Sequence, residues 1–174
     1  MAILQIESGE IFISSIEINK IIAPHKIGEF TLEPALKNLL AFPIKATITQ
    51  QLRAPKTLDQ EWTKKGLIKT GGGCLWQGAD ERLKNRINTS MLPHLDYGDE
   101  AHVCFAGGLI IYFLIANTQM ALIMQPQNWI FIKQGLPVWA KPTNDYFLTF
   151  ISYHGDMRDQ IEKKYVNIID RHVL

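Results

Sequence analysis

The chain has 174 residues, 47% of them hydrophobic, which is enough to bury the core of one domain. Its 18 basic and 17 acidic residues leave a formal net charge of +1, which argues against a nucleic-acid-binding protein because such proteins usually carry a basic excess. Cys74 and Cys104 are far apart and match no zinc-ligand spacing, so we expect buried thiols in a reducing compartment. Residues 1–12 lack the pattern of a signal peptide, and a cytoplasmic protein is expected.

The N-terminal segment predicts two strands and a helix. Residues 2–15 alternate in a way that indicates a strand, a turn at Ser8-Gly9 and a second strand. A short helix is expected next, with Ser14 or Ser15 as its N-cap and Glu17 near the capping-box position.

Residues 28–87 predict further short elements. A strand is expected at 28–33, and a short helix at 34–42, where a proline occupies the first turn. Gly71–Gly73 indicate a loop, and no Lys-Ser/Thr follows them as a phosphate-binding loop would require. The alternating charges at 79–87 are typical of a solvated helix.

From residue 87 onward the sequence consists of short runs rich in β-branched and aromatic residues, separated by Gly, Pro, Asn or Gln. Short strands at regular spacing predict a β-sandwich or barrel. The predicted strands are HVCF (102–105), LIIYFLI (109–115), MALIMQ (120–125), WIFIK (129–133), LPVWAK (136–141) and YFLTFISYH (146–154).

Two segments in this half allow more than one structure. Residues 103–124 are long enough to raise the question of a membrane helix, but their glycines, polar residues and β-formers favour two buried strands joined by a turn at 116–119. Residues 156–174 carry Ile161, Tyr165 and Ile168 at helical spacing, so a C-terminal helix is expected.

The segment MLPHLDYGDEAHV (91–103) concentrates side chains that bind metals. His94 and Asp96 share a face of an extended chain, as do Glu100 and His102, even if a turn at 97–99 separates the two pairs. Histidine with carboxylate suits Fe(II), Mn, Ni or Zn. The segment therefore predicts either a metal site or a solvated turn before a core strand.

Five aromatic residues in the predicted strands also admit two interpretations. They can line a ligand cavity, or they can pack in the core, which is the commoner use of such side chains. They are Tyr112, Phe113, Trp129, Phe131 and Trp139.

The 91–103 segment resembles the ligand segment of acireductone dioxygenases, metal-dependent members of the cupin superfamily. His94 matches the family's first histidine, and Asp99-Glu100 matches an acidic pair whose Glu is a metal ligand. Gly107-Gly108 falls near the family's turn between strands. Three further segments are similar and run in the same order: 3–27, 80–94 and 129–139.

The resemblance implies a mainly β fold with α elements. It implies a single cupin-type, double-stranded β-helix or jelly-roll barrel with an N-terminal α/β extension and a C-terminal helix. We therefore expect one domain over residues 1–174, in which 1–86 form the α/β portion, 87–155 the barrel core and 156–174 the helical tail.

The resemblance also implies a function. A divalent metal, foremost Fe(II) with Ni(II) or Mn(II) as alternatives, would bind a small enediol-type metabolite for reaction with dioxygen, as in methionine salvage. The implied metal ligands are His94, Asp96, Glu100 and His102, and His102 can instead serve as the catalytic acid–base group. The expected partners are a small-molecule substrate and dioxygen, without nucleic acid or membrane, for a monomer or small homo-oligomer.

Four positions depart from the family pattern. Asp96 replaces its second histidine, His102 an arginine and Ser152 a second arginine, and Pro137 and Val138 stand beside Trp139 where its last histidine is expected. His154 can supply a further nitrogen ligand. The alternative to a dioxygenase is therefore a diverged, non-catalytic cupin that binds a small ligand or a protein partner.

Overall fold

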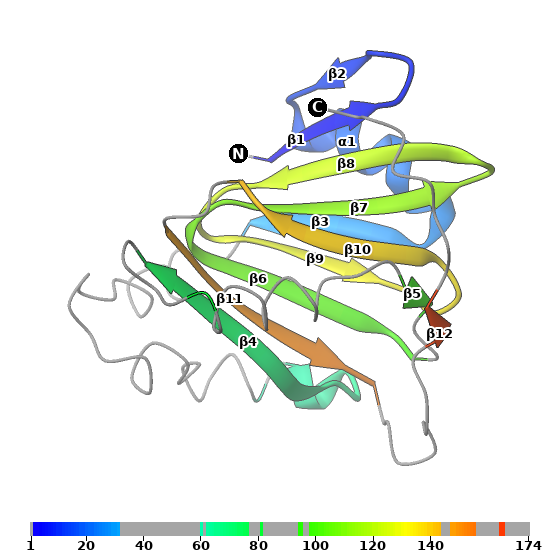
Figure 1. Ribbon diagram of the computed structural model, residues 1–174. Coiled ribbons are helices and arrows are strands. Elements are labelled where there is room, and N and C mark those ends of the chain that lie inside the picture. The colour runs from blue at the N-terminus through cyan, green and yellow to red at the C-terminus, as the bar shows by residue number, and fades with distance from the viewer. Residues whose placement is uncertain are drawn as a thin grey trace.

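The computed structural model describes residues 2–31, 60, 62–76, 81, 94–95, 98–143, 147–155 and 164–165. These residues form two antiparallel sheets (Figure 1). The seven-stranded sheet has the order β12 (Lys164–Tyr165), β5 (His94–Leu95), β10 (Pro137–Pro142), β7 (Leu109–Ile115), β8 (Thr118–Met124), β1 (Ile3–Ile6) and β2 (Ile11–Phe12). The five-stranded sheet has the order β3 (Ile27–Thr31), β9 (Asn128–Ile132), β6 (Glu100–Gly107), β11 (Phe147–His154) and β4 (Ile68–Trp76).

The two sheets share one hydrophobic core. Alternate residues of β7 and β8 contribute to it from the larger sheet, and alternate residues of β9 contribute from the smaller one, as the two-residue period of a strand requires. The other face of β7 is also buried, where it belongs to a separate cluster with Trp139 and Ala121. The shared core includes Leu4, Ile111, Phe113, Leu122, Met124, Cys104, Ile130, Ile132 and Val138.

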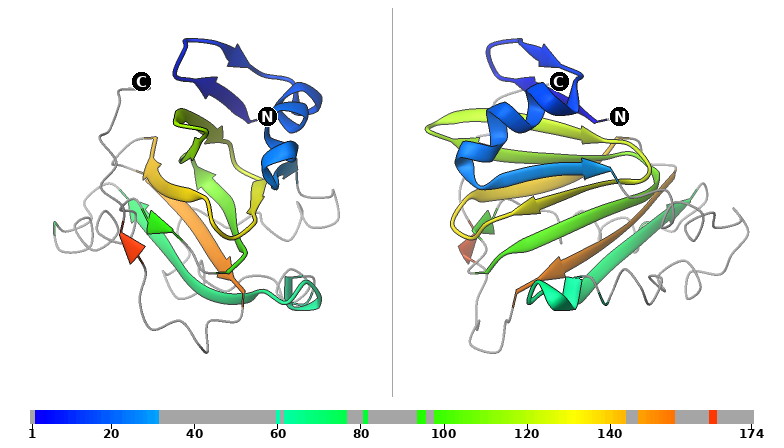
Figure 2. Two further views of the ribbon diagram at one scale, coloured as in Figure 1. Left: turned by 90° about the vertical axis from the view of Figure 1, so that its right-hand side faces the viewer. Right: turned by 180° about the vertical axis from the view of Figure 1, so that it is seen from behind.

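The first half of the chain contributes strands to both sheets. Strand β1 pairs with β8, β3 pairs with β9, and β4 pairs with β11. Helix α1 (Ser15–Ile22) and the 3₁₀ turn η1 (Ala23–His25) lead from β2 to β3, and Figure 2 shows them at the same end of the molecule as the β1–β2 hairpin. Ile18 and Ile22 of α1 are fully buried in the shared core.

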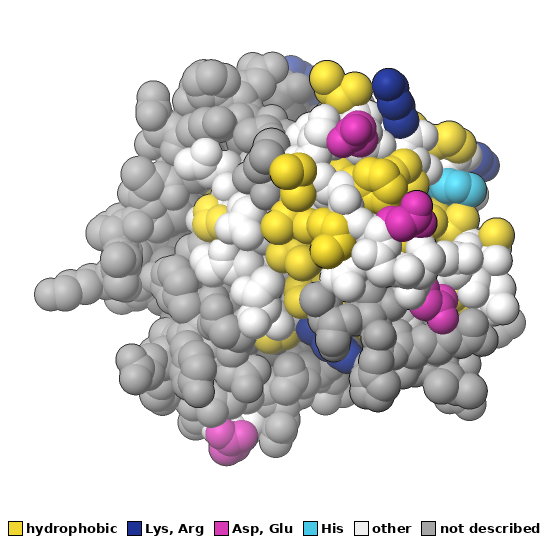
Figure 3. Space-filling model, turned by 90° about the horizontal axis from the view of Figure 1, so that it is seen from above, with side chains coloured by type: hydrophobic (Ala, Val, Ile, Leu, Met, Phe, Trp, Pro, Cys, Tyr) yellow, Lys and Arg dark blue, Asp and Glu magenta, His cyan; other side chains and the backbone are white. Residues whose placement is uncertain are grey.

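The outer surface of this segment carries hydrophobic side chains. Ile11, Ile13 and Ile16 are 62%, 56% and 71% exposed. Figure 3 looks onto this end of the molecule and shows hydrophobic side chains scattered among polar ones. Ile16 is therefore a surface position of α1, although its neighbours Ile18 and Ile22 lie in the core.

The long apolar segment forms the predicted pair of strands. β7 and β8 pair from Leu109↔Met124 to Ile115↔Thr118, and Ala116 and Asn117 form the turn between them. Both turn residues have positive φ, 49° and 66°, as a two-residue hairpin turn matched to the strand twist requires. No helix in the described part of the chain is long and apolar enough to span a membrane.

Replacing Ala116 with glycine should stabilise the protein by about 0.5–1 kcal/mol, since alanine is strained at positive φ and glycine is not. Urea unfolding followed by circular dichroism would measure the change. Ala140→Gly in β10 provides the control, because φ is not positive there and the same replacement should lower stability. A loss of stability in Ala116→Gly would contradict the strain argument.

Two local predictions were wrong. Gly71–Gly73 lie within strand β4, opposite Ser152, Ile151 and Phe150 of β11, so the ladder of backbone hydrogen bonds outweighs the weak strand propensity of glycine. Ser14 is the N-cap of α1 but makes no side-chain capping bond, so no capping box forms.

The prediction of a C-terminal helix was wrong for the part of the tail that the structure describes. Lys164 and Tyr165 form the short strand β12, which pairs with β5, because tertiary pairing outweighs the local helical spacing. The remaining residues of the predicted tail helix lie outside the described residues, as do the predicted helix at 34–42 and that at 79–87 except for Glu81.

Candidate functional site

Four polar side chains meet where β6 and β11 run side by side. In the register of the two strands, His102 lies opposite Ser152, and Glu100 lies opposite His154. On the other side of β6, Glu100 and His102 lie opposite Ile132 and Ile130, which belong to the shared core. Cross-strand partners project to the same face, so the four polar groups face the space between the two sheets.

These groups form a connected chain of contacts. His102 Nε2 is 3.0 Å from Glu100 Oε2, and His102 Nδ1 is 2.9 Å from Ser152 Oγ. An ionised carboxylate only accepts hydrogen bonds, so His102 Nε2–H donates to Glu100, and Nδ1 of a neutral ring accepts from the serine hydroxyl. His154 Nε2 is 3.5 Å from the same Glu100 oxygen, with its ring perpendicular to that of His102.

Glu100 is the central member of this chain. It is 1% exposed, and a carboxylate at that depth is costly without charged or hydrogen-bonding partners. Two imidazoles contact its Oε2, whereas Oε1 is buried with no hydrogen-bond partner among the described residues. A buried acceptor of this kind is suited to binding a cation or a proton donor.

The four predicted metal ligands are only partly visible. Glu100 and His102 share a face and touch, as predicted. His94 lies in β5 with its backbone opposite Val138, while its side chain and all of Asp96 lie outside the described structure. No group of three or more His, Cys, Asp or Glu side chains in the described part of the chain is arranged as a metal-ion site.

The predicted acidic pair divides between two places. Glu100 faces the space between the sheets, whereas Asp99 precedes strand β6 and forms an ion pair with Lys133, with 2.7 Å between Oδ2 and Nζ. Asp99 Oδ1 also accepts a hydrogen bond from the backbone N–H of Gln134. Only Glu100 of the two is therefore a member of the polar chain.

The five candidate aromatics have separate environments. Phe113 is fully buried in the shared core. Tyr112 and Trp139 stack with ring centroids 5.2 Å apart in the second cluster, on the other face of the larger sheet. Trp129 packs edge-to-face on Trp62, whereas Phe131 lines a surface groove. Core or surface packing thus accounts for all of them except Phe131.

Sequence reasoning brought Glu100 and His102 together but left Ser152 and His154 undecided. The two residues stand two apart in β11 and therefore share a face, which the alternation in YFLTFISYH indicates. Their meeting with β6 depends on a strand pairing across 50 residues of sequence, which alternation alone does not specify.

Several solved structures are similar to this chain. The chain is similar to acireductone dioxygenase from Bacillus anthracis, solved with a cadmium ion in its active centre. The likeness covers 90% of this chain and 94% of that one, with a TM-score of 0.66 and 12% identity. At this identity it shows a shared fold, which confirms the predicted mainly β fold class. No protein-family model and no curated protein matches the sequence.

Proposed function

We propose that this chain is a metal-dependent cupin, related to acireductone dioxygenase, that binds a small enediol-type metabolite and reacts it with dioxygen. The observation that carries the proposal is the buried Glu100 carboxylate, which faces the space between the sheets with His102 and His154 against it. The shared fold with a dioxygenase solved with cadmium in its active centre supports the same assignment.

The residues available fit a divalent metal by their chemistry. Glu100 offers an oxygen atom without a hydrogen-bond partner among the described residues, and histidine with carboxylate is a ligand set for Fe(II), Mn(II) or Ni(II). We propose Glu100, His94, Asp96 and His102 as ligands, Fe(II) being foremost among the metals. The backbone position of His94, opposite the core residue Val138, supports its inclusion.

The hydrogen bond between Glu100 and His102 sets a condition on metal binding. With 3.0 Å between Oε2 and Nε2, the two atoms share a proton, and a metal that binds both has to displace it. Metal affinity should therefore depend on pH. A bound metal would supply Lewis-acid stabilisation of the chelated substrate's negative charge.

His102 has two proposed roles that use its two nitrogen atoms. The contact of Nε2 with Glu100 supports a role as a metal ligand. The contact of Nδ1 with the Ser152 hydroxyl supports an acid–base role, because serine then holds the ring in a fixed orientation and can exchange a proton with it. His154 Nε2 lies 3.5 Å from the same carboxylate and places a second imidazole beside Glu100.

A second candidate function is a non-catalytic cupin that binds a ligand or a protein partner. Two observations favour it. No histidine stands beside Trp139, where the resemblance implies the last ligand, and Val138 there is a core residue. The Glu100–His102–Ser152 chain also satisfies most of its own hydrogen-bonding groups without a metal.

Metal analysis tests the first proposal against the second. Protein purified without an affinity tag, and the same protein reconstituted anaerobically with Fe(II), would be analysed by plasma mass spectrometry. Near-stoichiometric metal is expected in the wild type, and loss of about 90% or more in His94→Ala and Glu100→Ala, since removing one ligand of so few costs most of the affinity. Oxygen uptake with a synthetic enediol would follow for the loaded protein.

Matched controls are His25→Ala and Glu17→Ala, because both residues lie in the α1–η1 segment, away from the polar chain. Wild-type protein that takes up no metal after reconstitution would overturn the dioxygenase proposal and leave the binding cupin. Metal that remains in both site variants would show that these residues are not its ligands.

A further inference from the structure

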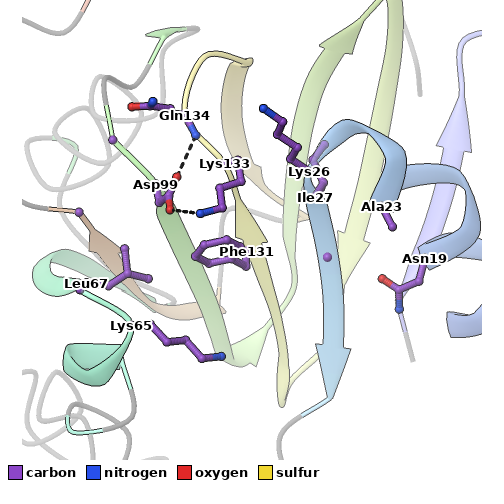
Figure 4. Close-up of a pocket in the computed structure, with 14 residues that line it drawn as sticks. Asn19, Ala23, Lys26, Ile27, Lys65, Leu67, Asp99, Phe131, Lys133 and Gln134 are labelled. Carbon is purple, nitrogen blue, oxygen red and sulfur yellow. Dashed lines mark hydrogen bonds and ion pairs between the residues drawn. The ribbon is translucent and has the colours of Figure 1, made fainter.

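A groove of about 1190 Å³ lies on the opposite face of the smaller sheet from Glu100 and His102. Phe131 lines it, and because Ile130 and Ile132 on either side belong to the core, Phe131 projects away from that core. The groove is thus separate from the candidate metal site. Its main lining residues are Lys26, Lys65, Leu67, Asp99, Phe131 and Lys133 (Figure 4).

The groove gathers positive charge in a chain that is almost neutral overall. Three lysines and one aspartate line it, which gives a formal charge of +2, whereas the whole chain has +1. The lysines come from three separate segments: Lys26 follows η1, Lys65 precedes β4, and Lys133 follows β9. A cleft with an excess of one sign of charge attracts ligands of the opposite sign.

Backbone hydrogen bonds fix the positions from which the side chains of Lys26, Lys65 and Lys133 extend. The N–H of Lys133 donates to the carbonyl of Lys26 at 3.0 Å, so these two residues are held side by side. Lys65 is held in a turn by a 2.9 Å hydrogen bond from its N–H to the carbonyl of Trp62. In Figure 4, Phe131 lies between Lys65 on one side and Lys133 and Lys26 on the other.

The ammonium groups of Lys26 and Lys65 remain available to an anion. Lys65 Nζ lies over the rings of Trp62 and Trp129, 5.1 and 5.0 Å from their centroids, which restricts its position but leaves its charge uncompensated. Within the described part of the chain, neither Lys26 nor Lys65 forms an ion pair. Lys133 pairs with Asp99, but that pair is partly exposed and such pairs contribute little.

The floor of the groove is apolar where the lysines surround it. Phe131 and Leu67 present an aromatic ring and an aliphatic side chain, and Lys133 Nζ is 5.4 Å from the Phe131 ring centroid. A flat ring can stack on Phe131 while an attached anion reaches the lysines. The volume is ample for such a molecule.

We infer that this groove binds a small organic phosphate in which a planar ring carries the phosphate group, the ring on Phe131 and the phosphate among Lys26, Lys65 and Lys133. This inference is independent of the proposed metal site. The ring distinguishes the ligand from inorganic phosphate, and the phosphate distinguishes it from a neutral aromatic molecule.

Binding of AMP, adenosine and inorganic phosphate, measured by isothermal titration calorimetry on the full chain, tests the inference. AMP should bind saturably, and adenosine and inorganic phosphate at least about tenfold more weakly, because each lacks one of the two contacts. Lys65→Gln and Lys133→Gln should each weaken AMP binding about five- to tenfold. Phe131→Leu should weaken the binding of AMP but leave the binding of inorganic phosphate unchanged.

Lys141→Gln is the matched control, since Lys141 lies over the Tyr112 ring at 5.4 Å, as Lys133 lies over Phe131, but on the other sheet. It removes the same charge and should leave AMP binding unchanged. The inference is overturned if AMP shows no saturable binding, if Lys141→Gln weakens it as much as Lys65→Gln, or if inorganic phosphate binds as tightly as AMP.

Discussion

Phe113→Ala should lower the free energy of unfolding by about 3–5 kcal/mol, the usual cost of removing a buried aromatic ring and leaving a cavity. Phe113 is fully buried near the middle of β7, opposite Met120 of β8 and Val138 of β10. Its cluster includes Ile130 and Ile132 of the other sheet, so the ring helps to hold the two sheets together. Equilibrium urea unfolding, followed by circular dichroism, would measure the loss.

Ile16→Ala is the control, because this side chain is 71% exposed on α1 and its removal should change stability by no more than about 0.5 kcal/mol. If Phe113→Ala lowered the free energy of unfolding no more than Ile16→Ala does, the two sheets would not share the core described above. The difference between the two variants matters more than either value, since both are subject to the same error in the unfolded-state reference.

Strand periodicity made most of the second half of the chain predictable. Runs such as LIIYFLI and WIFIK became β7 and β9 because their composition and spacing agree with the pairing that buries them. Where local pattern and tertiary pairing conflict, pairing prevails. Gly71–Gly73 have little strand propensity of their own, yet β11 holds them in register, and Tyr165 joins β5 despite its helical spacing.

Only the part of the candidate site that lies on a single strand was predictable from the sequence. Glu100 and His102 are two residues apart on β6, so alternation alone placed them on one face. Ser152 and His154 reach them through the β6–β11 register, which a single sequence does not specify. Asp99 shows the converse: it adjoins Glu100 in sequence, but it lies outside the strand and pairs with Lys133.

His102 and Ser152 stand where the resemblance to acireductone dioxygenases would imply arginines, and the two side chains are hydrogen-bonded to each other. The structure therefore engages both groups with one hydrogen bond. Glu100 is left as the buried charge around which the remaining groups are arranged.

Val138→His should raise metal affinity by roughly 100-fold if the proposed metal lies beside β10, because it adds a nitrogen ligand. Val138 is 2% exposed and its backbone lies opposite that of His94, a proposed ligand. Without metal, a buried imidazole that lacks partners should cost about 1–3 kcal/mol of stability. With metal, binding to the folded state alone should recover about 2.7 kcal/mol.

Leu122→His separates the cost of burying a histidine from the gain in metal affinity. Leu122 is fully buried in the same core, but it lies on β8, away from β5, so it should suffer the burial cost and gain no more stability from metal than the wild type gains. Competition with a chromophoric chelator would measure affinity, and urea unfolding with and without Fe(II) would measure stability. If metal stabilises Val138→His more than it stabilises the wild type and Leu122→His, the result supports one metal site that includes the β5–β10 pair; if the gain is the same in all three proteins, position 138 does not reach the metal.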